Sequence, residues 1–198
     1  GLSNTGIDFA NSLGIKLIVA IDCGITAVDK VAYAKSLGID MIICDHHQPP
    51  DQLPEAFAIM DPIQQGCEYP FKHLCGTGVA YKLIQSVCTI RNDLKFAYSL
   101  LDFVAIATSS DIVPIIDENR ILVNEGFNII NNNPRLSIKA LIEKIGIKES
   151  KVNTTNIVFS LAPRINAVGR LGEASRAVDL LTSEDESMMT ELATILDD

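Results

Sequence analysis

Four side chains able to bind a metal ion lie at the ends of two apolar, β-rich runs. Asp22 ends the run KLIVAID (residues 16–22), and Asp45 ends the run IDMIICD (39–45) and is followed by His46 and His47. In an open parallel sheet, ligands bind outside the carboxyl ends of the strands, so these side chains converge if the two strands are neighbours. Carboxylate and imidazole together suit Mn²⁺, Fe or Zn, and carboxylate-rich sites also admit Mg²⁺. The sequence therefore predicts a divalent-metal site at this edge.

Each of these residues also has a purely structural interpretation. An aspartate at a strand end often caps a helix or forms a hydrogen bond within a loop, and paired histidines are often only surface residues. The matching positions of Asp22 and the triplet 45–47 favour the metal site. A zinc cluster of Cys67, His73 and Cys75 is a weak alternative, because the spacing matches no common structural zinc site.

The elements that position these residues alternate between strand and helix. The runs 16–22 and 39–45 are continuously apolar, as expected of parallel strands buried on both faces, and AFAIMD (56–61) predicts a third strand. Thr26 is a candidate N-cap for a helix that runs to about Lys35, with Gly38 just past its end. This order predicts an α/β fold with a mostly parallel sheet flanked by helices.

The rest of the chain is mainly helical in pattern. We expect helices from Val79 to about Val87 and from Leu94 to about Thr108, and a short extended piece followed by a helix over 118–132. From residue 135 the pattern is wholly helical. The predicted division is therefore an α/β core at 1–133 and a helical sublobe at 134–198, ending in a linker helix.

Composition and charge narrow the class of protein. The 198 residues are 47% hydrophobic and 21% charged, which excludes a disordered chain. No apolar run approaches the ~20 residues of a membrane helix, and no signal peptide is visible. Five cysteines without a regular framework fit a reducing cytoplasm. The net charge is −9, yet residues 134–182 hold 8 basic and 4 acidic side chains. This excess indicates either a polyanion-facing patch or solvated helix faces.

Five sequence blocks carry a family resemblance. The triplet Asp45-His46-His47, with IVAIDCGIT before it and HQPPDQLPEAFAIMDP after it, resembles the DHH phosphoesterase superfamily. The blocks LCGTGVAYKL (74–83), SSDIVPIIDENRILVNEGF (109–127) and FSLAPRINAVGRLGEASRAVDLLTSED (159–185) are similar, in order and spacing, to RecJ-type single-strand-specific 5′→3′ exonucleases. The resemblance covers nearly the whole chain.

The resemblance implies a catalytic role for each matching residue. Asp22 would bridge two divalent metals, Mn²⁺ or Mg²⁺, and His46 and Asp111 would complete the shell of one of them. His47 would contact the scissile phosphate, and Asp45 would orient a histidine without binding metal. The implied reaction is two-metal hydrolysis of a phosphodiester.

The resemblance also implies a set of groups that bind the substrate phosphates. Backbone N–H groups would come from the turn that opens a helix, and guanidinium groups from a downstream motif. The positions are Gly76, Thr77, Gly78, Arg164, Asn166 and Arg170. A tight turn for the first three, and helix capping or an ion pair for Arg164, are the structural alternatives.

The implied function is single-stranded-DNA-specific 5′→3′ exonuclease activity in DNA repair and recombination. Relatives carry an earlier Asp-x-Asp block that supplies further metal ligands, and nothing in these 198 residues matches it. We therefore expect these residues to be a core piece of a larger nuclease, with impaired metal binding, little or no activity and an open sheet edge that favours self-association.

Single-strand-binding protein and a helicase are expected partners of the whole enzyme, and no membrane is. Two alternatives stay open: another DHH phosphoesterase acting on short oligonucleotides or cyclic dinucleotides, and a non-catalytic DHH-like DNA-binding scaffold.

Overall fold

The structure is a computed structural model that describes residues 1–147, 151–170 and 174–183. Its contacts divide the chain into two compact units. The α/β unit contains residues 1–98 and 113–119, and the helical unit contains 99–112 and the described residues from 120 onward. These units do not divide at the boundary that the sequence pattern suggests, between residues 133 and 134, because residues 99–112 and 120–133 belong to the helical unit.

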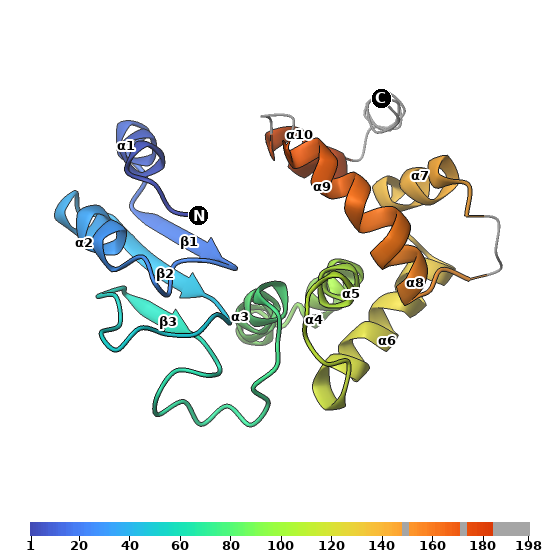
Figure 1. The fold of residues 1–198 in the computed structure, drawn as a ribbon, viewed down its shortest axis with the longest axis horizontal. Coiled ribbons are helices and arrows are strands. Elements are labelled where there is room, and N and C mark those ends of the chain that lie inside the picture. The colour runs from blue at the N-terminus through green and yellow to red at the C-terminus, as the bar shows by residue number, and fades with distance from the viewer. Residues whose placement is uncertain (148–150, 171–173, 184–198) are drawn as a thin grey trace. The chain divides into compact units, whose positions relative to one another are not determined.

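The α/β unit is built around three strands (Figure 1). Its elements are α1 (Asn4–Ser12), β1 (Leu17–Ile21), α2 (Val28–Ser36), β2 (Asp40–Cys44), β3 (Ala58–Met60), α3 (Gly76–Ile90) and most of α4 (Leu94–Ser99). The strands are parallel in the order β1-β2-β3, with Ile21 opposite Cys44 and Cys44 opposite Met60. The predicted parallel sheet is confirmed, and its three strands end at the same edge.

One face of the sheet carries the core of the α/β unit. Met41 and Ile43 on β2 pack with Val31 and Ala34 of α2 and with Ile7 of α1, all almost fully buried. These positions alternate along the strand as a pleat requires. The core therefore fixes the register of β2, and with it the point where the strand ends.

Two predictions about this region are wrong in detail. β1 is not buried on both faces: Leu17, Val19 and Ile21 share one face and each leave more than 40% of their surface exposed, so this face of β1 is only partly covered. Thr26 does not cap α2: the N-cap position is Ala27, and no side chain caps it. The helix still ends where Gly38, at φ +71°, follows it.

The segment 113–119 is tied to the α/β unit by side-chain hydrogen bonds. The Tyr69 hydroxyl donates to both carboxylate oxygens of Glu118, at 3.0 and 2.8 Å. Lys82 on α3 forms an ion pair with the same carboxylate at 2.8 Å. The buried Asn119 amide donates to the carbonyl oxygens of His73 and Pro114. These contacts fix the long connection between β3 and α3.

The helical unit consists of α5 (Leu101–Ser110), most of α6 (Asp117–Asn132), α7 (Leu136–Ile145), α8 (Thr154–Asn156), a π-helical turn η1 (Ile157–Leu161), α9 (Ala162–Arg170) and α10 (Ala174–Thr182). Residues 118–132 form one continuous helix, so the predicted extended piece at its start is wrong. The predicted single helix over 94–108 is two helices, α4 and α5.

A buried ion pair joins α5 to the start of α7. Arg135 donates to both oxygens of Asp102, at 2.5 and 2.9 Å, and to the Ser99 carbonyl at 2.8 Å. Its guanidinium also lies 4.0 Å from the centre of the Phe103 ring. Because Asp102 is fully buried, the bidentate contact is what satisfies its charge.

Among the described residues, no helix is long and apolar enough to cross a membrane.

Candidate metal centre

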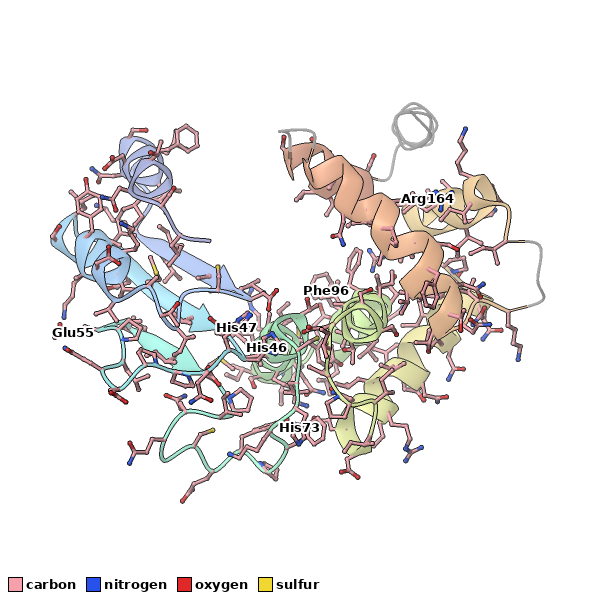
Figure 2. The ribbon with its side chains drawn as sticks, in the orientation of Figure 1. His46, His47, Glu55, His73, Phe96 and Arg164 are labelled. Atoms are coloured by element: carbon pink, nitrogen blue, oxygen red, sulfur yellow. The ribbon has the colours of Figure 1, made fainter. Side chains whose placement is uncertain are left out.

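Three of the predicted metal-binding side chains converge at the carboxyl edge of the sheet. Ligand atoms of Asp22, His46 and His47 all lie within 4.8 Å of one another. Asp22 follows β1, and the histidines follow β2, whose last residue pairs with the last residue of β1. Figure 2 shows the labelled His46 and His47 together just past the end of β2. The parallel register therefore produces the cluster that the sequence predicts.

Asp22 and His46 already contact each other. His46 Nε2 lies 3.1 Å from Asp22 Oδ1, and the side chain of His46 is 15% exposed against 58% for Asp22. The Asp22 backbone has φ +60°, a left-handed conformation that is uncommon for a residue with a side chain. Its N–H donates to the Cys44 carbonyl at 2.9 Å, which extends the β1–β2 ladder by one bond. The carboxylate is thus held by a backbone bend at the strand end.

Asp45 is the buried anchor of the histidine pair. Its Oδ1 accepts hydrogen bonds from the backbone N–H of His46 (2.8 Å), the backbone N–H of His47 (3.3 Å) and the ring Nδ1 of His47 (2.7 Å). Its Oδ2 accepts from the N–H of Ile25 at 3.0 Å. Burial alone would raise the pKa of Asp45, but these four hydrogen bonds lower it below its ordinary value. Because an ionised carboxylate can only accept a hydrogen bond, Nδ1 of His47 is the ring nitrogen that carries the proton. In the neutral ring, Nε2 is then unprotonated and can accept a hydrogen bond.

The first turn of α3 lies directly against Asp22. A Cβ placed on Gly76 would lie 2.6 Å from Asp22 Cβ and 2.7 Å from Asp22 Cα, so only glycine fits there. Cys75 is the N-cap, and its Sγ accepts from the N–H of Gly78 at 3.4 Å. Of the three predicted phosphate-binding amides at Gly76, Thr77 and Gly78, the third is therefore used within the helix cap. α3 begins three residues earlier than the predicted start at Val79.

Asp61 is a further carboxylate that sequence reasoning missed. It directly follows β3 as Asp22 follows β1, and this shared position was the signal in the sequence. Asp61 is almost fully buried; its Oδ1 accepts from the N–H of Ile63, and its Oδ2 has no hydrogen-bond partner in the described part of the chain. Burial, reinforced by the negative charge of Asp45, raises the pKa of Asp61 above its ordinary value despite the Ile63 hydrogen bond.

The remaining predicted site residues belong to the helical unit. Asp111 is the C-cap of α5, and its Oδ1 accepts from the N–H of Ile112 at 2.8 Å. Arg164 on α9 is half-buried and donates to the Ser160 carbonyl of the π-helical turn at 3.0 Å. Asn166 is exposed and, two residues further along the helix, lies about 200° around its axis from Arg164. The side chain of Arg170 lies outside the described residues.

The donor set fits a hard or borderline divalent cation. One carboxylate and two imidazoles suit Mn²⁺, and the exposed Asp22 leaves room for further oxygen ligands or water. Among the described residues, Cys67, His73 and Cys75 form no group that could hold a metal, so the alternative zinc cluster is not supported.

The fold and this site together define the class of protein. The chain belongs to the DHH family: residues 3–108 match the description "DHH family, N-terminal domain".

Known proteins place the chain close to one branch of that family. The chain is 45% identical over 184 residues to the single-stranded-DNA-specific exonuclease RecJ of Bacillus subtilis (strain 168), a match that covers 93% of this chain and 23% of that protein. A crystal structure of exonuclease RecJ bound to manganese matches with a TM-score of 0.86 at 28% identity, over 100% of this chain and 49% of that one. RecJ in complex with Mn²⁺ from Thermus thermophilus matches with a TM-score of 0.83 at 28% identity, over 98% of this chain and 28% of that one. The chain thus spans less than half the length of each.

Proposed function

We propose that this chain carries part of the catalytic centre of a metal-dependent exonuclease that hydrolyses single-stranded DNA from the 5′ end. The observation that carries the proposal is the convergence of Asp22, His46 and His47 at one sheet edge. The buried Asp45 fixes the His47 ring there by a hydrogen bond. The similarity to single-stranded-DNA-specific exonucleases, and to relatives solved with Mn²⁺ and with Mg²⁺, supports the same substrate and the same metals.

Asp22 and His46 are the residues that we assign to the cation, together with Asp111. A bound divalent metal supplies Lewis-acid activation of water and neutralises charge on the phosphodiester. Asp22 is suited to bridging two cations because its side chain is exposed and held by the backbone bend after β1. Asp111, at the C-terminal end of α5, is proposed as a ligand from the family resemblance.

His47 is the residue that we assign to the substrate phosphate. Its ring is exposed, and Nδ1 is bound to the ionised Asp45 at 2.7 Å. That contact fixes the ring orientation, and Nε2 can donate a hydrogen bond to a phosphate oxygen whenever that nitrogen also carries a proton. Asp45 therefore acts through His47 and touches neither metal nor substrate.

The phosphate backbone of the strand is proposed to contact the basic part of the helical unit. Asn166 on α9 is exposed, and Arg170 ends the same helix. The Arg164 guanidinium donates one hydrogen bond to the Ser160 carbonyl. We therefore assign its phosphate contact to the other N–H groups of the guanidinium.

A nuclease assay on the full-length protein that contains this chain tests the proposal. We expect Mn²⁺-dependent release of nucleotides from a 5′-labelled single strand, little release from a blunt duplex, and slower turnover of a dinucleotide. Asp22→Asn and His47→Ala should each lower the rate by about 100-fold or more. Asp40→Asn is the matched control, since Asp40 is exposed at the opposite end of β2. Preferred hydrolysis of the dinucleotide would favour the other DHH phosphoesterases, and metal-independent DNA binding without hydrolysis would favour the scaffold.

We further propose that the activity serves DNA repair and recombination in the cytoplasm. Single-strand-binding protein and a helicase are the proposed partners, because each produces or holds the single strand that the enzyme would consume. Co-purification of either protein with the full-length enzyme, lost when single-stranded DNA is digested away, would attribute the association to the substrate and not to a protein contact.

A further inference from the structure

The first turn of α3 and the residue after β1 approach each other more closely than any side chain allows. Gly76 is fully buried, and its missing Cβ would fall on the side chain and backbone of Asp22, 2.6 Å from Cβ and 2.7 Å from Cα. Real Cβ atoms essentially never approach a heavy atom within 3.0 Å. A methyl group at this position would therefore displace either α3 or Asp22 by several tenths of an ångström.

The backbone of α3 has little freedom to withdraw. The helix is fixed at its first turn by the Cys75 cap and by the buried Val79 and Ala80, and it packs on both β1 and β2. Further along, Lys82 is paired with Glu118 at 2.8 Å. Fifteen residues of helix would have to shift to accommodate one methyl group.

Asp22 is held more locally, by a small number of contacts. Its N–H donates to Cys44, and its carboxylate contacts His46 at 3.1 Å, but its left-handed backbone is intrinsically unfavourable for a residue with a Cβ. The side chain is the exposed partner of the pair. Of the two groups, Asp22 is the one that would yield.

We propose that Gly76 is a positioning residue for the Asp22 carboxylate: the absence of a side chain there lets α3 fix Asp22 in its left-handed conformation beside His46. Metal–ligand distances tolerate about 0.2 Å, and productive sites about 0.5 Å. The displacement that a methyl group demands reaches these limits, so a side chain at position 76 would act on the metal site through Asp22. The consequence for metal binding rests on the proposed function, whereas the contact with Asp22 does not.

Mn²⁺ binding by the full-length protein that contains this chain, measured by electron paramagnetic resonance, tests the consequence, with the wild type, Gly76→Ala and Gly78→Ala compared in that protein. Gly78 is the matched control because it is buried in the same helical turn, and a Cβ there would meet the Leu74 side chain at 3.4 Å and Cys75 Sγ at 3.7 Å, which are ordinary van der Waals distances. We expect Gly76→Ala to weaken Mn²⁺ binding by at least about 10-fold and to change the spectrum of the bound ion. Gly78→Ala should stay within about 3-fold of the wild type. Equal loss in both variants, or no loss in Gly76→Ala, would overturn the proposal.

A metal-free double-mutant cycle tests the contact itself, independently of the proposed function. In EDTA, Gly76→Ala should lower the urea midpoint of the wild type, and it should lower it much less when Asp22→Gly is present. Glycine at position 22 removes the clashing Oδ1 and Cβ, and its backbone, which adopts positive φ freely, can shift the remaining Cα away. If Gly76→Ala alone does not fold, recovery of folding by Asp22→Gly supports the proposal in the same way. Additive effects, or no recovery, would overturn it. If the wild type binds no Mn²⁺ while the cycle shows coupling, the proposed function fails and the positioning role stands.

Discussion

The same chemical change at two buried aspartates should move stability in opposite directions. Asp45 and Asp61 each follow a strand of the sheet, and each is 1% exposed. Asp45 accepts four hydrogen bonds, whereas Asp61 accepts one at Oδ1 and has an unpartnered Oδ2 among the described residues. The prediction is that Asp45→Asn destabilises the protein and Asp61→Asn stabilises it.

The size of the Asp45 effect follows from its hydrogen bonds. An asparagine can keep its oxygen toward His46 and His47, but its NH₂ group then faces the N–H of the buried Ile25. At least one hydrogen bond to a charged acceptor is lost, which is about 1.5–3 kcal/mol, and two donors are left facing each other. We expect Asp45→Asn to lower the free energy of unfolding by about 2–4 kcal/mol at pH 7. The amide of Asp61→Asn removes a buried charge with too few partners, and we expect a gain of about 1 kcal/mol.

The dependence on pH separates the two causes. The folded pKa of Asp61 is raised, so its charge destabilises the fold above that pKa, and the advantage of Asp61→Asn should shrink as pH falls from 7 toward 4. The folded pKa of Asp45 is lowered, so its stabilising charge is fully present above the unfolded pKa and is lost only below it. The deficit of Asp45→Asn should therefore not shrink over the same range.

Urea denaturation in EDTA, followed by circular dichroism at several pH values, measures both differences. Asp40→Asn is the control: Asp40 is exposed at the start of β2, and its replacement should change stability by less than about 0.5 kcal/mol. Two results would refute the reasoning: a free energy of unfolding that rises in Asp45→Asn, or one that falls in Asp61→Asn by an amount independent of pH.

Three further changes probe the packing of the two units. Gly126→Ala should destabilise the helical unit by about 1–3 kcal/mol in thermal unfolding, because a Cβ there would collide with the backbone of α5; an unchanged midpoint would contradict the close approach. Arg135→Ala should cost about 3–5 kcal/mol in urea denaturation by leaving Asp102 buried without its partner, and Arg135→Met combined with Asp102→Leu should recover most of that loss. Tyr69→Phe should accelerate hydrogen exchange in the segment 113–119, since it removes both hydrogen bonds to Glu118; unchanged protection there would contradict their anchoring role.

The chemistry at the sheet edge was predictable from the sequence because it depends on short-range patterns. Continuous apolar runs indicated parallel strands, and parallel strands end at one edge, which brings Asp22 and the triplet 45–47 together whatever the rest of the chain does. Asp61 obeys the same rule but was missed, since a single aspartate before proline looks like an ordinary turn signal.

What could not be predicted depends on contacts between residues far apart in the sequence. The close approach of Gly76 to Asp22 joins positions 54 residues apart, and no local pattern records it. The exposure of one face of β1 depends on what packs against that face and not on the composition of the strand. Helix α6 contains Gly126, where a Cβ would collide with α5, and this close approach is likewise absent from any local pattern.

The side-chain contacts of the segment 113–119 affect how the protein can fold during synthesis and how it can be cut into fragments. The chain leaves the α/β unit after residue 98, returns for 113–119 and leaves again, so neither unit is a continuous stretch of polypeptide. During synthesis, the α/β unit cannot complete its contacts until Glu118 and Asn119 have emerged from the ribosome, by which time α5 of the other unit has also been made. A gene fragment that stops at residue 98 would encode Asp22, His46 and His47 but not Glu118, the partner of Tyr69 and Lys82 in the loop between β3 and α3.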